Sequence, residues 1–273
     1  MGSYHTNTRR AVHGWGLVLF LLAFGLLMLR FPQVYHLAGV TTGSSGQLSP
    51  QAQQFQNKLI PFAQENGLVL SQWPDDLLEA AARNPEMEDF VMQYPLQKDS
   101  SESGDMQEYE NSQSVPLLMQ WDARWGYTSY ADAPLGLSGC GPACLSMVSM
   151  YLLQDTSWTP DAVARFSEDN GYSIPGGGSS WTLISEGGQL LGMDVTEIPL
   201  DRRRVMDALA AGHPIICVMG PGDFTTTGHF IVMTGCQDGK IKINDPNSKA
   251  RSGQLWEYDQ IQAQIKNLWI LRK

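Results

Sequence analysis

Cys140 lies between two glycines in the segment SGCGP (138–142), and it is the residue of this chain best suited to nucleophilic chemistry. The proline and the apolar residues that follow predict a buried helix over 141–153, with the cysteine at its start. Free N–H groups and partial positive charge at a helix N-terminus stabilise a thiolate, the nucleophilic form of cysteine. A structural Gly-Cys-Gly turn is the alternative interpretation.

Two later residues would supply a base and an orienting group. His229 begins an apolar strand predicted over 229–236, and Asp245 ends the next predicted strand, 240–245. The imidazole would take the thiol proton of Cys140, and the carboxylate would hold the ring in one tautomer.

The pairing of these strands decides whether the two side chains meet. A two-residue turn at Asp238-Gly239 would place His229 and Asp245 on opposite faces of the sheet. Their roles therefore require a bulge or a longer loop near residues 236–240 that changes the parity by one.

Gln120 begins the segment QWDARW (120–125), upstream of the cysteine. Its amide and the backbone N–H of Cys140 would form an oxyanion hole, in which one donor contributes roughly 3 kcal/mol of transition-state stabilisation. The alternative is a tryptophan-rich segment that packs on the core. Gly139, Gly141, Trp181 and Gly228 are expected at the substrate cleft.

We predict no metal and no cofactor. Cys140, Cys144 and His229 would lack a fourth ligand for zinc, and the chain has no Cys-x2-Cys pair. Cys144 lies one turn inside the predicted helix and is expected to be a core thiol. A Cys217–Cys236 disulfide is possible only if their strands are neighbours.

The positioning elements are helices first and antiparallel strands later, which predicts an α+β domain over 115–273. Further helices are predicted at 160–168, 181–192 and 202–211, and further strands at 214–219 and 267–271. The net charge of −10 and the lack of a basic stripe exclude nucleic acid as a partner. The chain also lacks a phosphate-binding loop, so no nucleotide is expected.

The first residues predict a membrane location. The stretch 15–29 carries no charge and follows Arg9 and Arg10, which favours an uncleaved signal anchor over 1–38, with the catalytic domain outside the cell. A secreted protein with a cleaved signal is the alternative.

Three segments connect this anchor to the main domain. Residues 39–56 read as a flexible stalk, 57–96 as a helical extension, and 97–114 as an acidic linker. Because 57–114 carry 12 acidic and 3 basic side chains, this part could occlude the cleft as a propeptide would.

Four motifs together resemble cysteine peptidase family thirty-nine, which is related to the bacteriocin leader peptidases of the papain-like clan. They are QWDARW (120–125), GCGPACLSM (139–147), GHFIV (228–232) and NDPN (244–247). The resemblance implies a papain-like fold, with N-terminal helices packed on an antiparallel sheet. It also implies that Cys140 is the nucleophile, His229 the base, Asp245 the orienting group and Gln120 the oxyanion donor.

One spacing departs from the leader peptidases, in which the glutamine lies much nearer the cysteine. The loop 126–138 must therefore fold back for Gln120 to serve. The expected activity is hydrolysis of a peptide or protein substrate. Alternatives are a cell-wall amidase or endopeptidase with the same triad, and a surface binding module that has lost turnover.

Overall fold

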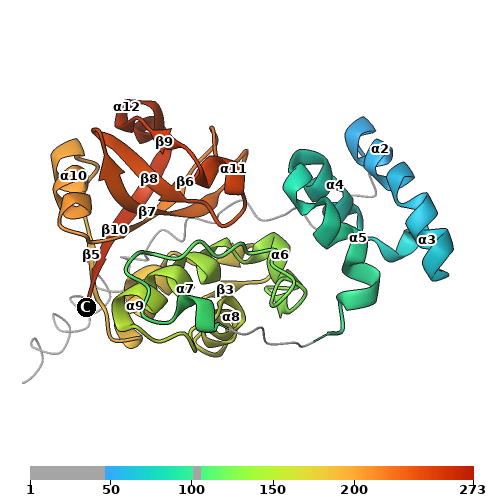
Figure 1. The fold of residues 1–273 in the computed structure, drawn as a ribbon, viewed down its shortest axis with the longest axis horizontal. Helices are drawn as coiled ribbons and strands as arrows, with labels where there is room; N and C mark the ends of the chain where they lie inside the picture. Colours follow the sequence, from blue (N-terminus) through green and yellow to red (C-terminus); the bar gives the residue numbers. More distant parts are fainter. Residues whose placement is uncertain (1–46, 101–105) are drawn as a thin grey trace, which may run out of the picture. The chain divides into compact units, whose positions relative to one another are not determined.

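The computed structural model describes residues 47–100 and 106–273, and a six-stranded antiparallel sheet forms the part that carries the site (Figure 1). The strand order is β5–β10–β6–β7–β8–β9. The strands are β5 (Asp194–Glu197), β6 (Ile215–Met219), β7 (His229–Gln237), β8 (Lys240–Asn244), β9 (Leu255–Trp256) and β10 (Ile265–Arg272). Two short hairpins lie outside this sheet, β1 (Ser129–Tyr130) with β2 (Ala133–Pro134) and β3 (Ser173–Ile174) with β4 (Gly178–Ser179).

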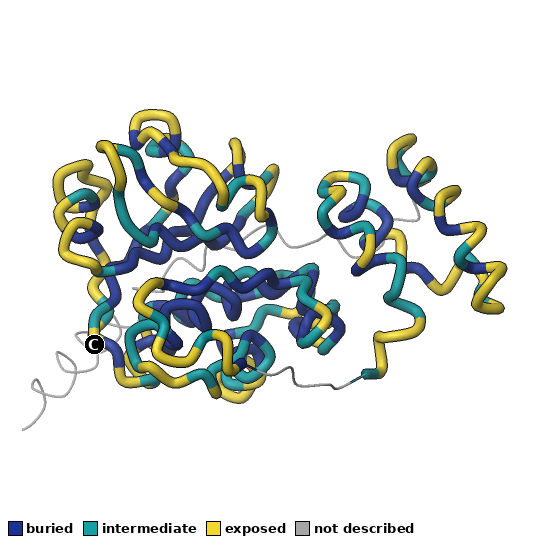
Figure 2. The backbone as a smooth tube through the Cα atoms, viewed as in Figure 1, coloured by how far each residue is buried: buried dark blue, intermediate teal, exposed yellow. Residues whose placement is uncertain are grey.

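Both faces of the sheet are covered, as Figure 2 shows for its central strands. In β6 every residue is buried, and alternate side chains enter two separate clusters. Ile216 and Val218 pack with the residues of α7 (Cys140–Leu153), whereas Cys217 and Met219 pack with those of α10 (Arg202–Ala210). This alternation is what a two-residue side-chain period predicts for a strand buried on both sides.

The remaining helices of the main domain are short. They are η3 (Gln107–Tyr109), α6 (Leu135–Ser138), α8 (Pro160–Asp169), η4 (Leu183–Gly187), α9 (Gly188–Leu190), α11 (Lys249–Ser252), α12 (Tyr258–Ile261) and η5 (Gln262–Gln264). The helix α7 is the longest that the structure describes, and its middle is buried because almost all its side chains are apolar or small. Its first residue is Cys140, at the position that the sequence predicts.

The helical extension forms a separate hydrophobic cluster, which also includes Tyr127 of the main domain. Its elements are α2 (Pro50–Lys58), α3 (Ile60–Asn66), η1 (Leu70–Gln72), α4 (Asp75–Arg83), η2 (Pro85–Met87) and α5 (Glu88–Gln97). The indole N–H of Trp73 donates to the carbonyl of Val91 at 2.7 Å, which ties the segment before α4 to α5. The described residues belong to one compact unit of the chain.

Several sequence expectations need correction. The stalk predicted over 39–56 is helical from Pro50, where a proline at the first position and the Ser49 cap begin α2. The helix predicted over 181–192 is a π-helical turn followed by one short α-helical turn. In the predicted acidic linker, the 3₁₀ turn η3 is held to the main domain, because Arg124 contacts Glu108 at 2.9 Å.

The predicted single-pass membrane location is contradicted. Within residues 47–100 and 106–273, no helix combines the length and the apolar character that crossing a bilayer requires. The segment 1–38, on which the prediction depends, lies outside the described residues.

Candidate active site

Cys140 is placed at the N-terminus of α7 by a short preceding turn. The N–H of Gly139 donates to the carbonyl of Leu135 at 2.7 Å, which closes α6 and lets α7 start one residue later. The thiol is partly exposed, and the first backbone N–H groups of a helix have no partner within the helix. The sulfur of Cys140 and the first amide donors of α7 therefore lie at the same helix end.

A bulge in β7 places His229 and Asp245 on one face of the sheet. The hairpin has a two-residue turn, with Gln237 opposite Lys240, but the register shifts between Met233 and Gly235. Beyond the shift Val232 pairs with Asn244, which sets Asp245 opposite Ile231 and therefore on the face of His229. The expected change of parity is confirmed, although the bulge lies upstream of the predicted 236–240.

The imidazole of His229 and the carboxylate of Asp245 are in direct contact. The ring Nε2 lies 2.8 Å from Asp245 Oδ1, and neither side chain is open to solvent. Because Nε2 is engaged by the carboxylate, Nδ1 is the ring nitrogen that remains for the Cys140 thiol. Cys140 is a neighbour of the ring, because its side chain contributes to the raised pKa of His229.

The charged groups at this site shift one another's pKa values toward the ionised forms. Burial would lower the pKa of His229, but the charge and hydrogen bond of Asp245, with smaller contributions from Cys140, raise it to about 10. Burial would raise the pKa of Asp245, but His229 and Arg251 together hold it below its usual range. The Nε of Arg251 donates to Asp245 Oδ2 at 2.6 Å. A buried carboxylate between two cations stays ionised and favours a protonated imidazole.

Gln120 lies beside the turn that leads to the cysteine. Its Nε2 donates to the carbonyl of Gly136 at 2.8 Å, and its Oε1 is buried without a hydrogen-bond partner in the described residues. The loop 126–138 does fold back, because Gly136 N also donates to the Gly126 carbonyl at 2.8 Å. One N–H of the amide is used by Gly136, which leaves the second as an available donor.

The glycines beside Cys140 are also required by packing. A Cβ on Gly141 would lie 2.5 Å from Ser179 Oγ, and one on Gly139 would lie 2.5 Å from the Leu135 carbonyl oxygen. Both glycines are buried, whereas Gly228, before β7, is partly exposed. Trp181 is partly buried and meets Trp269 edge to face, with ring centroids 6.2 Å apart. Substrate contact by these four residues stays a prediction.

The other three cysteines are unpaired thiols. Cys217 pairs with Ile231 and Cys236 with Ile241, so the two are not cross-strand neighbours. Burial, with Cys140 and Asp245 nearby, raises the pKa of Cys144 well above its ordinary value. Cys144 is therefore a neutral core thiol, as expected from its position inside α7.

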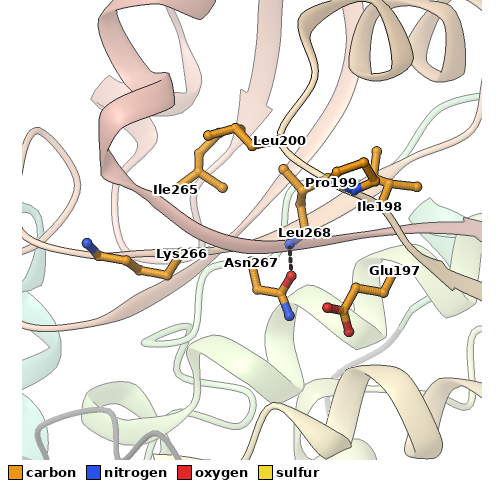
Figure 3. Close-up of a pocket in the computed structure, with 8 residues that line it drawn as sticks. All are labelled: Glu197, Ile198, Pro199, Leu200, Ile265, Lys266, Asn267 and Leu268. Atoms are coloured by element: carbon orange, nitrogen blue, oxygen red, sulfur yellow. Dashed lines mark hydrogen bonds between the residues drawn. The ribbon is translucent and has the colours of Figure 1, made fainter.

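The described residues form no metal cluster, and a cavity among them lies away from Cys140. In the described ranges no group of three or more His, Cys, Asp or Glu side chains is placed to hold a metal ion. A cavity of about 520 Å³ lies where β5 and β10 meet, and Figure 3 shows its eight lining residues in the segments 197–200 and 265–268. None of these residues is a predicted site residue, so the cavity is separate from the Cys140 site.

Sequence reasoning missed the residues that hold Asp245. Arg251 and Ser252 lie in a polar stretch without a recognisable motif, and Ser252 Oγ is 2.9 Å from the Asp245 amide. The backbone N–H of Asn247 donates to Asp245 Oδ1 at 2.8 Å. Asn247 belongs to the quoted NDPN motif, which was the one available signal for this role.

The chain belongs to the Peptidase_C39 like family, whose sequence profile matches residues 112–273. Membership of this family suggests a cysteine peptidase. The resemblance seen in the motifs is thereby confirmed. A search among curated proteins found no match.

Two solved structures show limited similarity. The peptidase domain of Streptococcus ComA, a bi-functional ABC transporter involved in a quorum-sensing pathway, is 22% identical, with a TM-score of 0.38 over 50% of this chain and 91% of that chain. A C39-like peptidase from Bacillus anthracis is 14% identical, with a TM-score of 0.35 over 58% and 94%. The family assignment rests on the sequence profile.

Proposed function

We propose that this protein is a cysteine peptidase that hydrolyses peptide bonds through a thioester acyl-enzyme. The observation that carries the proposal is the position of the His229 imidazole. Its Nε2 contacts Asp245, and the Cys140 side chain at the start of α7 contributes to its raised pKa. A nucleophile, a base and an orienting carboxylate in this order are what acyl transfer from a thiolate requires.

The proposed reaction has two halves. In the resting pair His229 is an imidazolium that holds the Cys140 proton on Nδ1, and the Cys140 thiolate attacks the peptide carbonyl carbon. The C–N bond then breaks as the imidazolium returns its proton to the leaving amine, which leaves a thioester on Cys140. In the second half His229 removes a proton from water, and the resulting attack releases the acid and the thiol.

Gln120 is the proposed second donor to the oxyanion in both halves. Its free amide N–H and the backbone N–H of Cys140 would receive the negative charge that develops on the carbonyl oxygen. The hydrogen bond to Gly136 would fix the amide in one orientation before substrate arrives.

The test is hydrolysis of a broad peptide library by the full chain, compared with the Cys140→Ala variant. We expect time-dependent cleavage that the variant lacks, while both have the same melting temperature. Zymography on peptidoglycan run in parallel separates general peptides from cell-wall stem peptides as the substrate. An intact Cys140 that cleaves neither material, and that reacts with iodoacetamide no faster than Cys140 in His229→Gln, would leave only a binding module.

A further inference from the structure

Two residues of the helical extension carry almost all of its hydrogen bonds to the main domain. In the part of the chain that the structure describes, these bonds end on Asn84 and Glu86, with one more on the Phe90 carbonyl. Asn84 is the cap of η2, and its Oδ1 accepts from the N–H of Glu86 at 3.1 Å. The contact is thus concentrated in the tight turn between α4 and α5.

The carboxylate of Glu86 caps the short helix α11. Ser248 Oγ donates to Oε1 at 2.6 Å, and the backbone N–H groups of Lys249 and Ala250 donate at 2.8 and 3.3 Å. Burial would raise the pKa of Glu86, but these donors and the charge of Arg251 hold it below the ordinary value. An ionised acceptor therefore satisfies amides that a four-residue helix leaves unpaired.

The helix that Glu86 caps also contains Arg251, which forms an ion pair with Asp245. Arg251 lies two residues after the capped Lys249, and it approaches the carboxylate oxygen that His229 does not use. From the other side, Asn84 Nδ2 donates at 2.6 Å to the carbonyl of Asn247, whose own N–H holds Asp245. The extension thus supports the orienting carboxylate through both flanks of the 245–252 segment.

The same extension reaches the oxyanion side of the site. The ring of Phe90 fills the space beside Gly126 and Gly136, where an added Cβ at either position would collide with it. Phe90 stacks on Tyr127, with centroids 4.5 Å apart, and its carbonyl accepts from the Tyr127 hydroxyl at 3.1 Å. Gly136 is the residue whose carbonyl holds the Gln120 amide.

We propose that Glu86 is a positioning residue for the active site. The extension would hold the 245–252 segment, which carries Asp245, in a fixed position relative to the Gly136 turn, which holds Gln120. The chain of contacts runs from Glu86 through α11 and Arg251 to Asp245, and from there to His229. None of the hydrogen bonds between the described parts of the extension and the main domain ends on Cys140 or His229. The contacts therefore favour support of the site over the propeptide-like occlusion considered from the sequence.

This inference rests on the proposed function, since positioning matters only if Cys140 and His229 form a reactive pair. The groups that face the pair are Asp245 and Arg251 from the β8 side, Cys144 from α7 and Tyr130 from β1. Loss of the Glu86 carboxylate would free α11 to shift Arg251, and Asp245 would then hold the imidazolium less firmly. The imidazolium would then be a weaker counter-charge for the Cys140 sulfur, and alkylation of Cys140 would slow.

The test is the pH dependence of Cys140 alkylation by iodoacetamide in the full chain, read by mass spectrometry of the Cys140 peptide. The variants are Glu86→Gln and, as matched control, Glu88→Gln, which removes the partly exposed ion pair with Lys58. For Glu86→Gln we expect Cys140 alkylation to rise at a pH about one unit higher than in the wild type. At pH 5 this corresponds to about tenfold slower alkylation. Glu88→Gln is expected to match the wild type.

Two controls separate positioning from unfolding. The melting temperature reports the stability of each variant, and alkylation of the buried Cys144 reports any loss of folded protein. Unfolding would expose Cys144, whereas loss of positioning would change only the pH profile of Cys140. If Glu86→Gln does not fold, Ser248→Ala removes one donor to Glu86 together with the cap that accepts from the Arg251 N–H, and it is expected to give a smaller shift in the same direction. A folded variant whose profile superimposes on the wild type overturns the inference. A wild-type profile that does not change in His229→Gln instead refutes the proposed function.

Discussion

His229 and Asp245 are 16 residues apart in the chain, and one extra residue in β7 brings their side chains into contact. That residue is Thr234, which the register skips between Met233 and Gly235. Since one residue changes the face of every side chain beyond it, the orienting contact depends on the length of the strand more than on its composition.

Deletion of Thr234 should therefore separate the pair. We expect the deletion to lower kcat/KM by at least about a hundredfold, because the carboxylate would leave the ring and the tautomer would be lost. Thr234→Ala keeps the residue count and is expected to stay within a few-fold of the wild type. Peptide hydrolysis measured at matched folded fractions distinguishes the two, and an active deletion variant would contradict the register argument.

Gln120→Ala should affect turnover and leave the thiol reactive. Loss of one oxyanion donor is expected to lower kcat by about 10²–10³, with little change in KM. Alkylation of Cys140 by iodoacetamide forms no oxyanion, so its rate should match the wild type. If both activities fall together, Gln120 would be a packing residue, which is the alternative interpretation of the QWDARW segment.

Gly141→Ala tests whether packing requires this glycine. The new methyl group would meet Ser179, and we expect a loss of about 1–3 kcal/mol in the free energy of unfolding, measured with urea. Gly141→Ala combined with Ser179→Gly removes the obstructing atoms and should recover most of the stability. A double variant that is as unstable as the single one would argue against this contact.

The ionised site predicts a definite dependence of stability on pH. The pKa of His229 is raised to about 10 in the folded chain, so its contribution is complete below about pH 6.5 and is lost as pH rises toward 10. The pKa of Asp245 is lowered, so its contribution is present above about pH 4 and is lost as pH falls further. Urea unfolding from pH 3 to 10 should show the wild type approach His229→Gln at high pH.

Arg251→Met should be more harmful than its partial exposure suggests. The Asp245 carboxylate is fully buried, and removal of one partner of a buried ion pair typically costs about 3–5 kcal/mol. We expect a lower free energy of unfolding at pH 7, with the difference from the wild type shrinking below pH 4 as Asp245 becomes protonated. A constant difference across this range would show that Arg251 acts by packing alone.

The sequence located the elements that have strong periodicity and the residues that belong to compact motifs. Helix α7 begins at Cys140 as predicted. The strand that begins at His229 and the strand that ends just before Asp245 are where their apolar runs indicated. The need for a parity change was also predictable, because it follows from strand geometry alone. The position of the bulge was not, since Thr234 is an ordinary strand residue and tertiary packing decides where the extra residue is absorbed.

The supporting residues were out of reach for a different reason. Glu86 and Ser248 are separated by 162 residues, and nothing local to either one indicates the other. Glu86 lies in the first turn of η2, and its contact with α11 depends on how the extension docks. Single polar residues such as Arg251 carry no periodic signal, so their contacts emerge only from the folded chain.

The ring of Phe90 has a practical consequence for anyone who trims this protein. The family profile begins at residue 112, yet Gly126 and Gly136 are shaped around an aromatic side chain that comes from upstream of that boundary. A fragment cut there would present an empty apolar socket beside the Cys140 turn, and such sockets recruit other chains or collapse. The unit to express, crystallise or inhibit therefore starts before α4, and a small aromatic compound that fits the socket would be a way to probe it.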